Sequence, residues 1–331
     1  MKKKLLTAVL LMSICFGSCT RNAQQSGTAA RAGGGIQKRS IGFIQLVDNG
    51  AFADMRQGFL DKLKELGYSD DLLTVNYKNA QGDIGTLNSI CQEMANGDYD
   101  VVVTIATPAA QAFVNQGSKI PLIFISVTDP VASGIMSSME TPDKNATGTS
   151  NLVPVDEIFK LADKLTPGIT NYGMLYNTGE SNAVTTIRKA KDYLDTQKVS
   201  YIEATVTNSS EVQQASESLV RRTSAIYIPI DSMVQSAMPQ VAQIAKDAKI
   251  PVYGSSPVMV VSGALATVSV GDYYMGGISA EMADTYFKGT PITSIPAKIM
   301  DEFITVINKD TAGILGITIP QELSQAMMIG Q

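Results

Sequence analysis

Short apolar runs rich in β-branched residues alternate with amphipathic segments along most of this chain, and this alternation constrains the fold more than any other feature. The first run is Ile41 to Leu46. The segment after it carries apolar residues at helical spacing, from Met55 to Leu66, and ends at Gly67, a residue type typical of helix caps. Strands and helices that alternate in this way form parallel sheets covered by helices on both faces. We therefore predict an α/β fold.

The alternation occurs twice, which predicts two lobes. The predicted strands of the first half are Ile41 to Leu46, Leu73 to Tyr77, Val101 to Ala106 and Leu122 to Val127, and those of the second half are Tyr172 to Tyr176, Tyr201 to Val206, Ala225 to Ile230 and Val252 to Gly254. Between the two sets, residues 129–150 are rich in Pro, Gly, Ser, Thr and Asn and are predicted to cross from one lobe to the other.

The last third of the chain is predicted to pass between the lobes again. It contains a predicted strand at Gly263 to Val268, a helix at Tyr273 to Gly289 that returns to the first lobe, and a closing strand at Phe303 to Asn308. We expect two Rossmann-like lobes with parallel sheets, joined by a multi-strand hinge and separated by a cleft. The first lobe is predicted to comprise 40–149 and about 271–294, and the second 150–270 and about 295–325.

The N-terminus is typical of an exported lipoprotein. Three lysines precede 12 largely apolar residues, Leu5 to Phe16, fewer than the roughly 20 of a spanning helix, so 1–18 are predicted to be a signal peptide. The sequence Phe16-Gly17-Ser18-Cys19 resembles a lipobox, although Leu is usual in place of Phe16, and it predicts lipid attachment at Cys19. The alternative is an ordinary cysteine beyond a conventional cleavage site. Residues 19–39 are predicted to be a flexible tether to a bacterial membrane, on its periplasmic or cell-surface side.

The chain contains no histidine and no tryptophan. Catalytic triads with an imidazole base, His-ligated metal sites and histidine pH sensors are therefore excluded. We expect no metal and no cofactor. A cleft without histidine must hold its ligand with carboxylates, hydroxyls and backbone amides. Binding is then expected to vary little between about pH 6 and 8, unless the pKa of a carboxylate is strongly shifted.

Charge and cysteine content narrow the function further. Removal of 1–18 leaves 23 basic and 31 acidic residues, a net charge of −8, which is unsuited to nucleic acid or to anionic lipid surfaces. Cys15 leaves with the signal peptide and Cys19 is acylated, so Cys91 remains alone and is predicted to be a small buried hydrophobe.

Ligands of open α/β sheets bind beyond the carboxyl ends of the strands, so the residues that follow each strand are the candidate site. In the first lobe these are Gln45, Asn49 and Phe52 after the first strand, Thr107 and Ala109 after the third, and Thr128 and Asp129 after the fourth. Thr107 is predicted to cap a helix with Pro108 at its first position, which would leave the next amides open to a carboxylate.

The second lobe presents a matching set of polar residues. They are Glu180, Ser181 and Asn182 after its first strand, Asp231 after its third and Ser255 after its fourth. Asp129, Glu180 and Asp231 are candidates to meet a ligand ammonium, because a buried cation needs a paired carboxylate. The alternative for each residue is a helix cap with nothing bound.

Several motifs resemble, in the right order, the tryptophan/tyrosine-type substrate-binding proteins of ABC transporters. They are the lipobox, Ile-Gly-Phe-Ile-Gln at 41–45, Asn-Ala-Gln-Gly-Asp at 79–83, Ala-Thr-Pro-Ala-Ala-Gln at 106–111, Val-Thr-Asp-Pro at 127–130, Leu-Tyr-Asn at 175–177, Ala-Ile-Tyr-Ile-Pro at 225–229 and Gly-Ala-Leu-Ala-Thr at 263–267. The resemblance implies a type I periplasmic-binding-protein fold that closes on an amino acid and delivers it to a permease and its ATPase.

The same resemblance implies roles for individual residues. Thr107 and Ala109 would meet the ligand carboxylate, and Ser181, Asn182 and Asp231 would face it from the second lobe. The chain departs from the family at Ser255-Ser256-Pro257, where relatives often carry acidic residues, and this weakens the transfer of ligand specificity.

The leading hypothesis is a monomeric, lipid-anchored receptor that binds an amino acid, aromatic as a first choice, and that is not an enzyme. A receptor for a sugar or another polar solute is an alternative, although Phe52 and Tyr273 are the only visible aromatic platforms. An exported hydrolase that uses carboxylates is a further alternative, but no nucleophile elbow or phosphate loop is present. A transcription regulator would need a DNA-binding head, and a structural lipoprotein would have an empty, closed cleft.

Overall fold

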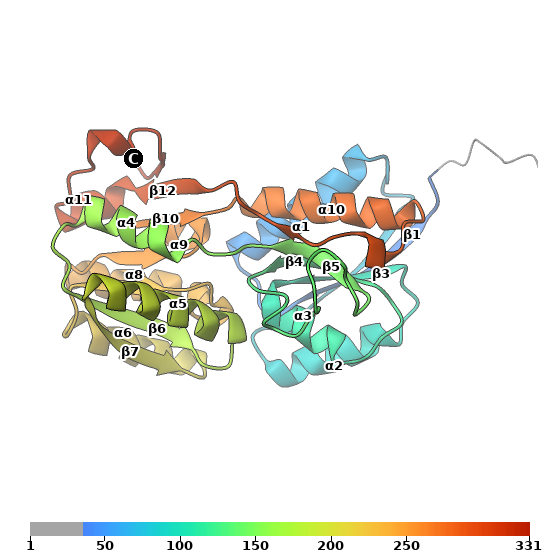
Figure 1. Ribbon diagram of the computed structural model, residues 1–331, viewed down its shortest axis with the longest axis horizontal. Coiled ribbons are helices and arrows are strands. Elements are labelled where there is room, and N and C mark those ends of the chain that lie inside the picture. Colours follow the sequence, from blue (N-terminus) through green and yellow to red (C-terminus); the bar gives the residue numbers. More distant parts are fainter. Residues whose placement is uncertain (1–35) are drawn as a thin grey trace, which may run out of the picture. The chain divides into compact units, whose positions relative to one another are not determined.

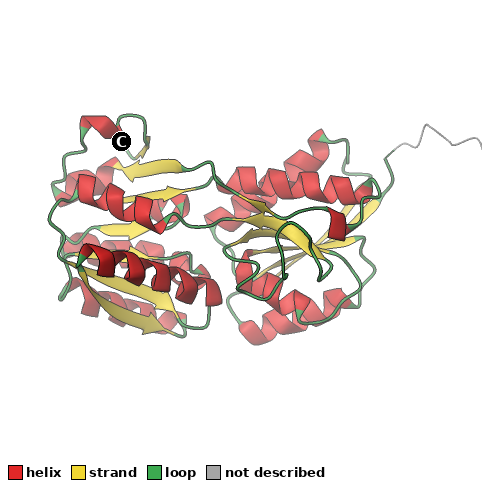
Figure 2. Ribbon diagram, in the orientation of Figure 1, coloured by secondary structure: helices red, strands yellow, loops and turns green. Residues whose placement is uncertain are grey.

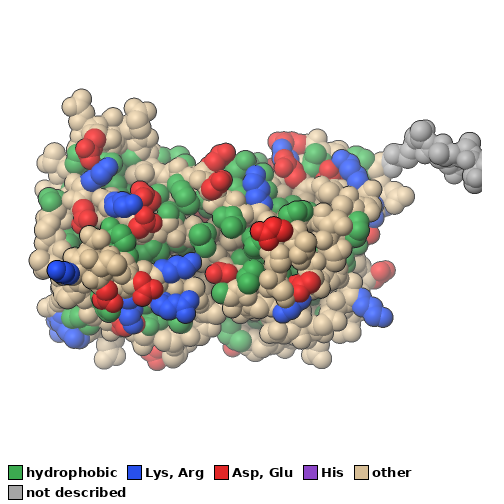
Figure 3. All heavy atoms as spheres, viewed as in Figure 1, with side chains coloured by type: hydrophobic (Ala, Val, Ile, Leu, Met, Phe, Trp, Pro, Cys, Tyr) green, Lys and Arg blue, Asp and Glu red, His purple; other side chains and the backbone are tan. Residues whose placement is uncertain are grey.

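The computed structural model describes residues 36–331, which form one compact unit. The predicted signal peptide, Cys19 and most of the predicted tether lie outside these residues. Two sheets make up the unit, and each has helices on both faces (Figures 1 and 2). No helix within 36–331 combines the length and apolar character needed to cross a membrane. On the face drawn in Figure 3, acidic and basic side chains are interspersed.

The first sheet has the strand order β11-β5-β4-β3-β1-β2, and every pair in it is parallel. Its strands are β1 (Arg39–Gln45), β2 (Leu73–Asn79), β3 (Val101–Ile105), β4 (Leu122–Val127), β5 (Ala146–Ser150) and β11 (Lys298–Ile299). The four strands predicted from sequence are present. Strand β5 lies in the segment predicted to be a loop, because its residues Ala-Thr-Gly-Thr-Ser carry no apolar pattern. A Cβ at Gly148 would lie 1.9 Å from the Phe124 carbonyl oxygen, so this position of the sheet requires glycine.

Helices cover both faces of the first sheet. They are α1 (Gly50–Glu65), α2 (Ile84–Ala95), α3 (Ala106–Val114) and α10 (Asp272–Phe287), with a short 3₁₀ turn, η2 (Ile292–Ser294). One face packs Phe43 against Phe59 edge to face, with ring centroids 5.8 Å apart. The other face packs Phe124 with Met94 and Cys91. Cys91 is fully buried and has a free thiol, which confirms the sequence prediction.

The second sheet has the order β13-β12-β10-β9-β8-β6-β7. Its strands are β6 (Asn171–Asn177), β7 (Ser200–Val206), β8 (Ala225–Ile228), β9 (Val252–Gly254), β10 (Ala266–Ser269), β12 (Ile304–Asn308) and β13 (Met327–Ile329). Strand β12 runs antiparallel to β10, whereas the other pairs are parallel. The expectation of purely parallel sheets is corrected at this pair, because β12 enters the second sheet directly from the first lobe.

The helices of the second lobe are α4 (Val155–Leu165), α5 (Ser181–Gln197), α6 (Val212–Val220), α7 (Ser232–Ser236), α8 (Met238–Asp247), α9 (Pro257–Val261) and α11 (Lys309–Leu315), with 3₁₀ turns η1 (Ser209–Glu211) and η3 (Gln321–Leu323). The sequence predicted the longer ones. Helices α7, α9 and α11 have five to seven residues, too few for the apolar period to repeat.

The chain passes between the two sheets three times (Figure 1). The crossings lie at 151–154 after β5, at 270–271 after β10 and at 300–303 after β11. The third crossing therefore comes after β11, which belongs to the first sheet. The second lobe was predicted to resume at about 295, a few positions earlier. In the first sheet β2 is the edge strand away from the crossings, and in the second sheet that strand is β7.

Helix α10 returns from the second sheet and packs along α1 in the first lobe. Two glycines permit the close approach. A Cβ at Gly276 of α10 would lie 2.0 Å from the Met55 carbonyl oxygen, and one at Gly58 of α1 would lie 2.0 Å from the Tyr273 carbonyl oxygen. These contacts involve backbone atoms, so no side chain can rotate away to make room.

We expect Gly276→Ala to destabilise the protein, because the added methyl forces α1 and α10 apart. Overpacking of this kind costs about 1–3 kcal/mol, enough to lower the melting temperature by several degrees in a thermal unfolding experiment. The matched control is Gly313→Ala in α11, where an added Cβ has nothing within 4 Å. Equal melting temperatures for the two variants would contradict close packing at Gly276.

Candidate functional site

A cavity of about 620 Å³ lies between the two lobes, beyond the carboxyl ends of the strands. The loops after β1 and β2 line it on one side, and the loops after β6 and β7, together with α7, line it on the other. Because β2 and β7 are the edge strands away from the crossings, the cavity lies on the side of the cleft away from the hinge. Its apolar lining includes Leu46, Val47, Ile84 and Met233. Of the ligand residues predicted from sequence, Glu180 lines this cavity.

Asp231 is fully buried at the end of β8 and caps α7. Its Oδ1 accepts the backbone N–H of Val234 at 2.9 Å, and its Oδ2 accepts the backbone N–H of Asn177 at the end of the neighbouring strand β6. The side chain therefore fastens together the ends of two adjacent strands and orients its carboxyl group at the cleft end of the sheet.

Glu180 lies just before α5 and is 2% exposed. It does not cap its own helix but reaches across to α7. Its Oε2 accepts the backbone N–H of Ser232 at 3.0 Å, and its Oε1 accepts that of Met233 at 3.3 Å. The Glu180 and Asp231 carboxyl groups accept consecutive backbone N–H groups at the start of α7, so the two groups are neighbours. The two acids predicted from separate strand exits thus form one buried carboxyl pair.

The environment of the carboxyl pair favours protonation. Burial, and then the charge of Asp231, raise the pKa of Glu180 to about 8. Burial also raises the pKa of Asp231, although hydrogen bonds from Val234, Asn177 and Met233 act in the opposite direction. In residues 36–331, no lysine or arginine forms an ion pair with Glu180 or Asp231. Such a pair needs a proton or an external cation.

The other predicted residues of the second lobe differ in accessibility. Ser181 is half-buried and its hydroxyl donates to Oε1 of Gln111 in the first lobe, 3.2 Å away, so it joins the two walls of the cleft. Asn182 is 3% exposed; its Nδ2 donates to the Ile230 carbonyl oxygen at 2.8 Å, and its Oδ1 has no partner in the described residues. Ser255 is fully buried, and its hydroxyl donates to the Ile228 carbonyl oxygen at 2.9 Å.

Helix α3 begins at Ala106, and Thr107 lies inside its first turn. The Thr107 hydroxyl accepts the backbone N–H of Thr128 at 3.4 Å, so the prediction that Thr107 caps the helix is wrong. No side chain caps this helix, whose first turn also contains the fully buried Ala109. The N–H groups of the first turn therefore remain without a side-chain acceptor, as an anion site requires.

Thr128 and Asp129 follow β4 but have different partners. The Thr128 hydroxyl donates to Oδ1 of Asn151 at 3.3 Å, and Asn151 Nδ2 donates to the Ser126 hydroxyl at 2.6 Å. Since Asn151 belongs to the first crossing, this network ties the strand end to the hinge. Asp129 is half-buried and its Oδ1 accepts the backbone N–H of Ala132 at 2.9 Å, which closes a turn.

Backbone strain marks the same edge of the first sheet. Ala106 has φ of 68° and Ser126 has φ of 62°, values in the left-handed region that residues with a Cβ rarely adopt. They lie at the ends of the neighbouring strands β3 and β4. Strained backbone of this kind concentrates at binding sites, where the surrounding structure holds it in place.

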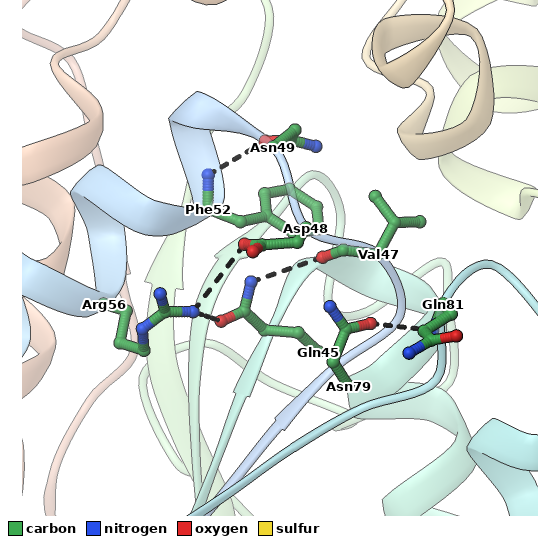
Figure 4. Close-up of polar contacts among 8 residues, drawn as sticks. All are labelled: Gln45, Val47, Asp48, Asn49, Phe52, Arg56, Asn79 and Gln81. Atoms are coloured by element: carbon green, nitrogen blue, oxygen red, sulfur yellow. Dashed lines mark hydrogen bonds and ion pairs between the residues drawn. The ribbon is translucent and has the colours of Figure 1, made fainter.

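Gln45 at the end of β1 is directed into the protein (Figure 4). It is fully buried; its Nε2 donates to the Val47 carbonyl oxygen at 3.3 Å, and its Oε1 accepts a hydrogen bond from Arg56. The Arg56 guanidinium lies 4.4 Å from the centre of the Tyr77 ring and 3.9 Å from the Asp48 carboxylate. Gln45 therefore fixes the loop that carries Leu46 and Val47 to the cavity.

Asn49 and Phe52 hold the start of α1. Oδ1 of Asn49 accepts the backbone N–H of Phe52 at 3.0 Å, whereas its Nδ2 is buried with no partner among the described residues (Figure 4). Phe52 is 3% exposed and packs in the core of the first lobe. It is therefore not the exposed aromatic platform expected from sequence. A sugar ring would have to find another stacking partner.

The sequence prediction missed Arg56, Gln111 and Asn177 as residues that shape the site. Asn177 could have been found, because it directly follows a predicted strand. Gln111 lies six residues beyond the end of β3, and Arg56 lies eleven residues beyond Gln45, so only the fold brings them to their partners.

Comparison with known families identifies this arrangement. Residues 40–328 match the family described as ABC transporter substrate binding protein. The chain belongs to this family. Its members are binding proteins rather than enzymes, and the substrate-binding proteins of ABC importers are extracellular or periplasmic.

Two similar proteins bind aromatic amino acids according to their descriptions. The tyrosine-binding protein of Clostridioides difficile (strain R20291) is 32% identical over 308 residues, covering 93% of this chain and 89% of that protein. The crystal structure of an ABC domain from Streptococcus pneumonia in complex with L-Trp is 29% identical, with a TM-score of 0.86, covering 88% of this chain and 100% of that one.

Two further comparisons concern conformation and fold. The ligand-free, open structure of a substrate binding protein with adhesive properties from Clostridium difficile is 32% identical, with a TM-score of 0.68, covering 88% of this chain and 99% of that one. Sugar-transporter proteins at 14 and 15% identity, with TM-scores of 0.60 and 0.58, share the fold alone. The fold of this substrate-binding protein is that of type I periplasmic binding proteins.

The carboxyl pair makes the stability of the substrate-binding protein depend on pH. Burial raises the pKa of Glu180 to about 8, so the folded protein keeps a proton that an unfolded glutamate releases near its ordinary pKa of 4.5. Stability of the ligand-free protein is therefore expected to fall as pH rises from about 5 to 8, since the folded state binds more protons than the unfolded state. Glu180→Gln is expected to reduce this fall, measured as the melting temperature against pH.

The matched control for this pH series is Glu140→Gln. Glu140 is exposed, and hydrogen bonds to its carboxylate lower its pKa, so it stays ionised over the whole range in both states. Asp272 is buried at the start of α10, and its pKa is raised to about 7 by burial and then by Asp54. It therefore causes a loss of stability with rising pH that is the same in all these variants. A Glu180→Gln profile parallel to that of the control would refute a protonated Glu180.

Proposed function

We propose that this protein is the receptor of an ABC importer for an aromatic amino acid, which it captures between its lobes and delivers to the permease and its ATPase. The observation that carries the proposal is the buried carboxyl pair, Glu180 and Asp231, which has no cationic partner within residues 36–331 and of which Glu180 lines the interlobe cavity. An ammonium group satisfies such a pair, and a neutral sugar does not. The tyrosine- and tryptophan-binding relatives support the same ligand class.

Each group of an amino acid has a place among these residues. The ammonium meets Glu180 and Asp231, with Oδ1 of Asn182 as a third acceptor, because that buried oxygen has no partner in the described residues. The carboxylate meets the uncapped first turn of α3, at Thr107 and Ala109. The aromatic ring is directed toward the apolar part of the cavity.

Closure of the lobes completes the site. The hydrogen bond from Ser181 to Gln111 joins the start of α5 to α3, and so connects the loop that carries Glu180 with the helix that meets the carboxylate. The TM-score of 0.86 with the L-Trp complex, against 0.68 with the open relative, supports a movement of this kind. Receptors of this type bind by closing two preformed lobes around one solute.

Ligand-dependent stabilisation tests the proposed function. We expect L-tryptophan or L-tyrosine to raise the melting temperature of the purified protein, since a ligand at 100 times its Kd adds about 2.7 kcal/mol. Tryptamine, which lacks the carboxylate, and indole-3-propionate, which lacks the ammonium, are the matched control ligands and should each bind at least about tenfold more weakly. No stabilisation by any amino acid would rule out this ligand class.

The receptor is proposed to act as a monomer held to a bacterial membrane by lipid on Cys19, with residues 19–39 as the tether. We expect wild-type protein in the membrane fraction of the expressing cells and Cys19→Ser protein in the soluble exported fraction, measured by immunoblot. Cys15→Ser, within the predicted signal peptide, is the matched control and should remain in the membrane fraction. Membrane association of both variants would contradict attachment at Cys19.

A further inference from the structure

The carboxyl pair has a charge requirement that deepens the proposed function, on which this inference rests. The oxygens of Glu180 and Asp231 accept backbone N–H groups from Ser232, Met233, Val234 and Asn177. These donors orient the carboxyl groups but bring no net charge. The two carboxyl groups are buried side by side on consecutive N–H groups of α7, and two neighbouring buried carboxyl groups cannot both ionise without an added cation, so a proton is needed on one of them.

The charged groups that the structure describes around the pair, within residues 36–331, supply no compensating cation. Asp83, across the same cavity, is acidic, and hydrogen bonds from Thr86 and Gly85 lower its pKa, so it adds negative charge. Helix α3, which contacts the start of α5 through Gln111, carries no charged residue, and α7 carries none. The basic residues of α5 begin at Arg188, two turns from Glu180, and Lys191 pairs with Glu203.

We propose that the empty receptor holds one proton between Glu180 and Asp231, and that the cationic nitrogen of the ligand displaces this proton into water as it binds. The balance is simple: the pair passes from one negative charge with a shared proton to two negative charges around one ammonium, and one proton leaves for solvent. The exchange keeps the buried charge small in both states. It also explains selection for solutes with a cationic nitrogen, since a neutral solute leaves the proton in place.

The exchange fixes the pH dependence of ligand affinity. The proton is released at every pH below the pKa of the empty pair, which burial has raised, so affinity rises with pH between about 6 and 8, by up to tenfold per pH unit. The absence of histidine by itself predicts that ligand affinity is independent of pH in this range. The affinity is expected to change with pH because burial shifts the pKa of a carboxyl group into the range in which histidine normally titrates.

Proton release is measured by titration calorimetry of L-tryptophan into the receptor at pH 7, in buffers with different ionisation enthalpies. We expect close to one proton released per ligand for the wild type, close to none for Glu180→Gln, and the wild-type value for the control Glu140→Gln. Binding of L-tryptophan with no proton released overturns the exchange and leaves the proposed function standing. Failure of every amino acid to bind overturns the proposed function.

Infrared spectroscopy tests the proton without any ligand. The empty wild-type receptor at pH 6 should show the carbonyl stretch of a protonated carboxylic acid, and the band should lose intensity in Glu180→Gln relative to Glu140→Gln. Asp272→Asn identifies the part of the band that belongs to the other buried acid. If Glu180→Gln does not fold, Asp231→Asn serves in its place. A band unaffected by substitution of the pair overturns the inference.

Discussion

Hydrogen bonds from backbone amides to two buried carboxyl groups hold the cleft wall of the second lobe together. Asp231 joins the end of β6 to the start of α7, and Glu180 joins the start of α5 to the same short helix. Helix α7 has five residues and little intrinsic stability, so these side chains fix its place. The same contacts that build the wall concentrate negative charge on it. The structure of the wall and its charge therefore have one origin in this lobe.

Much of the fold could be predicted from the sequence because buried strands consist mainly of apolar residues. Strands such as β3 and β4 are buried on both faces and read as continuous apolar runs. Strand β5 is equally buried but has no apolar run. Gly148 must fit against the Phe124 carbonyl group, and the threonines on either side of Gly148 form hydrogen bonds to other elements through their hydroxyls. The antiparallel direction of β12 could not be predicted either, because the direction of a strand is decided by the crossing that precedes it.

The candidate site could be predicted as a set of positions but not as a set of orientations. Every predicted ligand residue lies at the end of a strand or after it, yet Gln45 is directed inward to Val47 and Arg56, Phe52 joins the core, and Thr107 lies within a helix turn. The sequence indicates which side chains reach the end of a sheet. Whether a side chain faces ligand or protein depends on partners that are distant in sequence, such as Arg56 for Gln45.

The return of α10 and β11 to the first sheet has a consequence for biogenesis. A chain that emerges from its N-terminus has made β1 to β5 long before it has made Asp272–Phe287 and Lys298–Ile299, which cover α1 and extend the sheet beyond β5. The first lobe cannot be complete until nearly all of the second has been synthesised. Neither lobe corresponds to a continuous fragment, so a single cut in the gene cannot separate them. Late completion means that the first lobe reaches its final fold only near the end of synthesis.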